Sequence, residues 1–99
     1  MATTNNKISL CIPRVESTYT KDFIRGVFNN CRLGVIDTID IVPNHKEHAK
    51  YNRVFVHYGN MTSDFHLTRL LNGSSLKVVY DGPWFWKCVQ SKLPRKNNN

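Results

Sequence analysis

Apolar residues alternate with polar ones in four short segments of the chain, and in two segments between them they recur every three or four residues. Alternation is typical of a β-strand with one buried face, and the longer repeat is typical of an amphipathic helix. The segments follow one another in the order strand, helix, strand, strand, helix, strand. The strands are expected over residues 7–15, 33–43, 53–58 and 75–81, and the helices within residues 16–31 and 62–73.

Capping residues support the two helices. Thr20 is expected to be the N-cap of the first helix, with Asp22 in the first turn, where the helix dipole favours an anion. Ser63 is expected to cap the second helix, and Asn72 with Gly73 to stop it. Both helices therefore have a start signal in the sequence.

The order of the elements predicts an α+β fold, the ferredoxin-like βαββαβ plait. Each helix connects two strands and is long enough for a right-handed crossover. The four strands would then form one antiparallel sheet with both helices on one face. The face under the helices would carry Ile8, Leu10, Val54 and Val56. The opposite face, left for solvent or a partner, would carry Ser9, Cys11, Asp40, Arg53, Phe55, His57, Lys77 and Val79.

The 99 residues have room for one domain. We expect it to span residues 7–93, with flexible polar tails over residues 1–6 and 94–99. No apolar run approaches the roughly 18 residues needed to cross a bilayer, and the polar N-terminus has no features of a secretory signal. The protein is therefore expected inside the cell, without a membrane partner and with its cysteines reduced.

The chain is strongly basic. Fourteen lysines and arginines stand against seven acidic residues, which gives a formal net charge of +7. This charge on so small a domain favours polyanionic partners, because binding releases the counterions that surround them. Nucleic acid is the expected polyanion, and the alternative is that the charge serves solubility alone.

Two segments, "ISLCIP" (residues 8–13) and "YNRVFVHY" (residues 51–58), lie on the first and third expected strands. They resemble the hexapeptide and octapeptide motifs of the RNA recognition motif (RRM) family, and the resemblance covers about residues 7–82. Members of this family place three aromatic side chains on the uncovered sheet face, where bases stack. The resemblance implies an RRM-like fold that binds single-stranded RNA, or single-stranded DNA. "KISLCIPRV" and "DGPWFWKC" also resemble segments of small RRM-like proteins of large DNA viruses, which implies the cytoplasm or nucleus of an infected cell, or a virion.

The three stacking positions of the family match in part. Phe55 falls on the fifth position of the octapeptide and keeps the aromatic ring. Arg53 falls on the third position, where the family usually has Phe or Tyr, and a guanidinium can also stack on a base. Ser9 falls on the stacking position of the hexapeptide, where it cannot stack. The resemblance thus implies that Phe55 and Arg53 bind bases, with His57 and Lys77 beside them.

The segment "DGPWFWKC", residues 81–88, contains both tryptophans of the chain. One hypothesis is that Trp84 and Trp86 cover the core, since tryptophan is usually buried in large part. The other is that Trp84 or Trp86 extends the stacking surface and replaces the ring missing at Ser9. The cations expected to contact phosphates are Lys50, Lys87, Lys92, Arg95 and Lys96.

No pattern in the sequence indicates catalysis, a metal or a cofactor. His45 and His48 have a ligand-like spacing, but zinc sites usually need four ligands. Arg14 and Asn52 loosely resemble the catalytic pair of acylphosphatases, but the loop after the first strand lacks the glycines of a phosphate cradle. We therefore expect a binding protein without enzymatic activity. The alternative to nucleic-acid binding is an RRM-like protein–protein interaction module that has lost its stacking surface.

Overall fold

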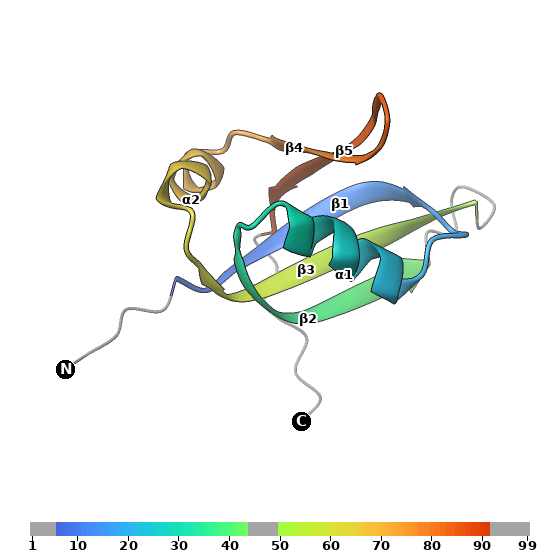
Figure 1. The fold of residues 1–99 in the computed structure, drawn as a ribbon, viewed down its shortest axis with the longest axis horizontal. Helices are drawn as coiled ribbons and strands as arrows, with labels where there is room; N and C mark the ends of the chain where they lie inside the picture. Colours follow the sequence, from blue (N-terminus) through green and yellow to red (C-terminus); the bar gives the residue numbers. More distant parts are fainter. Residues whose placement is uncertain (1–5, 44–49, 92–99) are drawn as a thin grey trace.

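A computed structural model describes residues 6–43 and 50–91 of the chain (Figure 1). Several sequence-based expectations fall outside these residues. They concern most of both tails, the loop residues His45 and His48, and the cations Lys92, Arg95 and Lys96.

The described residues form five strands and two helices (Figure 1). The strands build one antiparallel sheet in the order β2-β3-β1-β5-β4, so that β2 and β4 are its edges. The elements are β1 (Ile8–Glu16), α1 (Lys21–Asn30), β2 (Gly34–Pro43), β3 (Tyr51–Met61), α2 (Asp64–Leu71), β4 (Leu76–Asp81) and β5 (Trp84–Gln90).

The predicted four-stranded ferredoxin-like plait is wrong, because the sheet contains a fifth strand. The chain reverses after β4 at a turn in which Gly82 has a φ of 56°, a conformation that glycine adopts without strain. β5 then returns antiparallel to β4 and also pairs with β1, where Cys11 faces Val89. The place beside β1 that the plait gives to the fourth strand therefore belongs to β5, and β4 lies one strand farther out.

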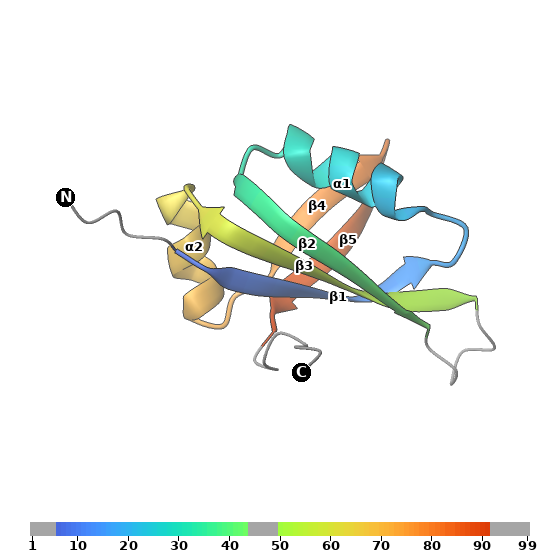
Figure 2. The same cartoon turned by 90° about the horizontal axis from the view of Figure 1, so that it is seen from below.

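The two helices also differ from the expected arrangement. α1 lies across one face of the sheet, whereas α2 lies near one end of it (Figure 2). The N-cap of α1 is confirmed: the hydroxyl of Thr20 accepts a hydrogen bond of 3.1 Å from the backbone N–H of Phe23. Ser63 occupies the N-cap position of α2, but its hydroxyl lies 2.7 Å from Nδ1 of His66 and does not bond to the helix backbone. No helix among the described residues is long and apolar enough to cross a membrane.

The core lies between the sheet and α1. Alternate residues of β1 are buried, as the sequence pattern predicts, and α1 adds Ile24 and Phe28. The β4–β5 hairpin rises beside α1 in Figure 2 and contributes the side chains of Trp86 and Cys88. The buried apolar residues are Ile8, Leu10, Ile12, Val15, Ile24, Phe28, Leu33, Ile39, Val54, Val56, Tyr58, Met61, Leu70, Val78, Trp86 and Cys88.

Candidate nucleic-acid interface

The strand register brings polar and aromatic residues together on the sheet face opposite α1. Cys11 of β1 and Asp40 of β2 both lie directly opposite Phe55 of β3, one on each side. Ser9 and Thr38 flank His57 in the same way. Residues directly opposite one another in an antiparallel pair share a face. We call this surface the outer face and define it by Ser9, Cys11, Thr38, Asp40, Arg53, Phe55 and His57.

Phe55 is the aromatic residue at the centre of the outer face. Its side chain is half-buried, and its ring lies nearly parallel to the imidazole of His57, with 6.4 Å between the centroids and 10° between the planes. Arg53 is exposed two residues before it. Burial raises the pKa of the Cys11 thiol, and the positive charge of Arg53 acts in the opposite direction. Phe55 and Arg53 thus lie on the same face of β3, as the alternation along the strand predicts.

His57 links three strands through its ring nitrogens. Nδ1 lies 2.6 Å from the hydroxyl of Ser9, and Nε2 lies 2.9 Å from Oδ2 of Asp40. A carboxylate only accepts hydrogen bonds, so Nε2 of His57 donates to Asp40, and Nδ1 pairs with the Ser9 hydroxyl. The side chain of His57 is 5% exposed and that of Asp40 is 44% exposed. Since both nitrogens are occupied, His57 positions its neighbours, whereas Asp40 remains accessible.

The outer face continues onto the β4–β5 hairpin. Val89 lies opposite Cys11, and alternation along β5 then places Lys87 and Phe85 on the same side. Four exposed residues lie on this side of the hairpin: Lys77, Val79, Phe85 and Lys87. We call them the hairpin patch, together with Trp84, which is exposed next to Phe85 although alternation puts it on the other side of β5.

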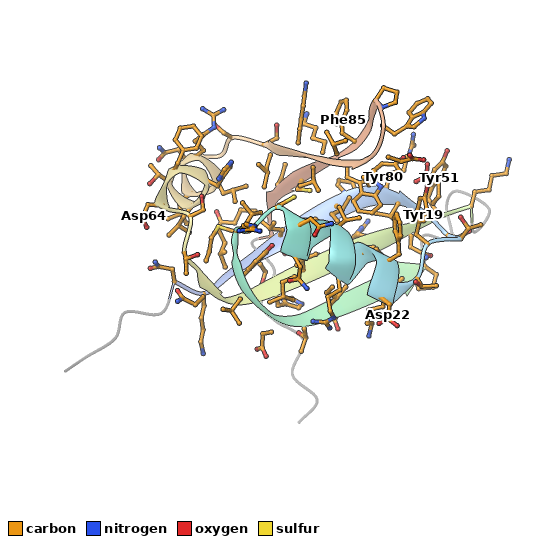
Figure 3. The ribbon with its side chains drawn as sticks, in the orientation of Figure 1. Tyr19, Asp22, Tyr51, Asp64, Tyr80 and Phe85 are labelled. Carbon is orange, nitrogen blue, oxygen red and sulfur yellow. The ribbon has the colours of Figure 1, made fainter. Side chains whose placement is uncertain are left out.

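The hairpin patch combines rings with positive charge. Lys77 pairs with Lys87 across the two strands, and its ammonium nitrogen lies 4.8 Å from the centroid of the Phe85 ring, a cation–π distance. Figure 3 shows Phe85 on the hairpin, pointing away from α1. Trp84 beside it is 64% exposed and Phe85 is 45% exposed. Such a cluster can hold a stacked base and a neighbouring phosphate.

The two tryptophans have different environments. Trp86 is 3% exposed and stacks on Tyr80, with 4.3 Å between the ring centroids. Its other neighbours include Tyr19, which approaches edge-on, and the ring of Phe28. Core packing therefore accounts for Trp86, and Trp84 is the tryptophan accessible to a ligand.

Lys77 does not lie beside Phe55 and Arg53 as expected, because β1 and β5 lie between β3 and β4. It pairs with Lys87 in the hairpin patch, whereas Lys50 is exposed just before β3. Sequence reasoning did not single out Phe85, or the position of Asp40 beside Phe55. Alternation could have placed Phe85 on the side of Lys87, but only the strand register shows that Asp40 and Phe55 are neighbours. Within residues 6–43 and 50–91, no group of three or more His, Cys, Asp or Glu side chains could hold a metal ion.

Comparison of the chain with models of known protein families, with curated proteins and with solved structures finds no match.

Proposed function

We propose that this protein binds single-stranded nucleic acid across the outer face and the hairpin patch, without a cofactor and without catalysis. The observation that carries the proposal is the continuity of these surfaces from Phe55, through Cys11 and Val89, to Phe85. Aromatic rings lie at both ends of this path, with Arg53, Lys77 and Lys87 near them, and the chain has a net charge of +7. Resemblance of the two sequence motifs to the RRM family favours RNA over DNA.

Stacking would supply part of the affinity. Each base stacked on an aromatic ring contributes about 1–3 kcal/mol by alanine substitution. Phe55 offers a half-buried ring held by its strand neighbours, and Trp84 and Phe85 offer accessible rings in the hairpin patch. Stacking sites on both surfaces suit a short single strand that crosses from the outer face to the hairpin.

Phosphate contacts would supply the rest. Arg53, Lys77 and Lys87 lie along the proposed path and are exposed. Three phosphate contacts to a single strand give a slope of roughly −2 for log K against log salt. Affinity should then fall by roughly 20-fold between 50 and 200 mM salt. Further cations of the C-terminal segment, Lys92, Arg95 and Lys96, would make the dependence steeper.

The test is a titration of fluorescently labelled single-stranded RNA and DNA oligonucleotides at two salt concentrations. Phe55→Ala and Phe85→Ala should each weaken binding by 5- to 150-fold, the equivalent of about 1–3 kcal/mol. Phe65→Ala is the matched control, because Phe65 is 67% exposed on α2, outside both surfaces, and its loss should leave affinity unchanged.

Two results would contradict the proposal. If neither substitution on the sheet weakens binding beyond the control, the rings do not stack on bases. If no oligonucleotide binds even at low salt, the protein-docking alternative takes its place.

We also propose a positioning role for Ser9, His57 and Asp40, although they are the residue types of a hydrolytic triad. His57 is 4% exposed, which leaves little room for a substrate between its ring and the Ser9 hydroxyl. A fluorophosphonate that labels activated serines should accordingly leave the protein unmodified. The sequence resemblance to proteins of large DNA viruses extends the proposal to binding inside an infected cell or a virion.

A further inference from the structure

We propose that Asp40 makes the Phe55 stacking site selective for guanine, an inference that rests on the proposed nucleic-acid binding. Asp40 lies directly opposite Phe55 on β2, and such cross-strand neighbours have Cβ atoms about 4.5–5.5 Å apart. A base that stacks on the Phe55 ring therefore has its edge within reach of the Asp40 carboxylate. Because that side chain is 44% exposed, a ligand can approach it.

The carboxylate is held in place by the buried His57. The Nε2–H of His57 donates to Oδ2 of Asp40 at 2.9 Å, and Ser9 occupies the other ring nitrogen at 2.6 Å. An ionised carboxylate has about four acceptor positions on its two oxygens, and this hydrogen bond occupies one of them. The remaining positions are available to donors of a ligand, and the orientation of the group is fixed before binding.

Among the four bases, guanine matches an acceptor pair of this kind. Its Watson–Crick edge has two adjacent donors, N1–H and the N2 amino group, which align with the two oxygens of a carboxylate. Adenine and cytosine have one amino donor next to a ring nitrogen whose lone pair the carboxylate repels. Uracil has its N3–H between two carbonyl oxygens. The Asp40 carboxylate therefore favours binding of guanine over the other three bases.

The test compares oligonucleotides of nine uridines in which the central base is unchanged or is replaced by guanine, adenine, cytosine or inosine. A good bidentate contact discriminates against the wrong base by roughly 5- to 150-fold, so the guanine oligonucleotide should bind at least about 5-fold more tightly than the others. Inosine lacks the N2 amino group and should lose most of this preference. This comparison uses the unaltered protein and does not depend on how a variant folds.

Asp40→Asn should abolish the preference for guanine while it preserves binding of the uridine oligonucleotide. Asp37→Asn is the matched control, because Asp37 is an exposed residue of the same strand and its substitution removes the same charge. The control should raise the affinity for every oligonucleotide alike and keep the preference.

The outcomes separate the two proposals. Equal binding of the guanine, adenine and cytosine oligonucleotides, or a guanine preference that persists in Asp40→Asn, overturns the role of Asp40 and leaves nucleic-acid binding intact. Failure of all the oligonucleotides to bind overturns both.

Discussion

Substitution of Trp86 and of Trp84 separates core packing from ligand binding. Trp86 is 3% exposed and stacks nearly parallel to Tyr80 and to Phe28, with interplanar angles of 16° and 13°. Its indole nitrogen is buried and has no hydrogen-bond partner among the residues that the structure describes. Trp84, two residues earlier on β5, is 64% exposed. Substitution of Trp86 should therefore lower stability, whereas substitution of Trp84 should weaken binding.

The expected magnitudes follow from these environments. Truncation of a buried aromatic side chain to alanine costs about 3–5 kcal/mol, and removal of the unpaired N–H returns about 1–3 kcal/mol of this. From the middle of both ranges, Trp86→Ala should thus lower the free energy of unfolding by about 2 kcal/mol. At 4–8 °C for each kcal/mol in a domain of this size, the Tm should fall by roughly 8–16 °C. Trp84→Ala should change stability by less than about 0.5 kcal/mol.

Trp86→Phe isolates the contribution of the unpaired indole nitrogen. This substitution keeps a stacking ring but removes the unpaired N–H. Removal of that donor should stabilise the fold by about 1–3 kcal/mol, which offsets the loss of two buried ring carbons, about 1.6 kcal/mol. Its Tm should lie close to that of the unaltered protein. In binding assays on folded protein, Trp86→Phe should retain affinity for RNA, whereas Trp84→Ala should weaken it.

Thermal denaturation measures the stability changes, and acrylamide quenching of fluorescence measures exposure. The Trp86→Phe protein retains Trp84 and should be quenched readily, and a Trp84→Phe protein retains the buried Trp86 and should be quenched poorly. Loss of RNA binding in Trp86→Phe without a change of Tm would contradict the reasoning. A larger Tm decrease for Trp84→Ala than for Trp86→Ala would contradict it as well.

Two further predictions concern stability. Gly34→Ala should lower the free energy of unfolding by at least about 2 kcal/mol, because Gly34 has a φ of 155° and an added Cβ would meet the backbone oxygen of Asn60. Gly26→Ala, within α1, should raise it by about 0.5–1 kcal/mol, because the added Cβ would meet no atom within 4 Å beyond its own helix backbone. Chemical denaturation that gives both changes the same sign would refute this. Burial raises the pKa of the Cys88 thiol above its ordinary value of 9.0, so the folded chain keeps a proton that the unfolded chain releases. This stabilisation is present below about pH 9 and is lost as the pH rises above it, by about 1.4 kcal/mol for each pH unit. Cys88→Ala should therefore make the decrease of Tm between pH 9 and 10 less steep. An unchanged slope would show that the Cys88 thiol does not cause the decrease.

Local sequence patterns predicted which side chains lie together on a face. Alternation in β1 and β3 separates Leu10 and Val56, which are buried, from Cys11 and Phe55 on the outer face. Thr20 marks the start of α1 in the same local way. These features depend on residues close in sequence, because strand alternation and helix capping are set within a few residues.

The strand order and the registers depend on tertiary structure. The segment after Asp81 alternates as a strand should, and Gly82 permits a tight turn. This pattern fits two structures equally well: an extension of the fourth strand, or a fifth strand that pairs with it in a hairpin. Pairing of β5 with β1 decided between them and buried Trp86 against α1. In the same way, alternation puts Asp40 on some outward face, whereas the β2–β3 register puts it beside Phe55. A period of two residues specifies the face of a side chain but not its neighbour on the next strand, and contacts between distant segments supply that choice.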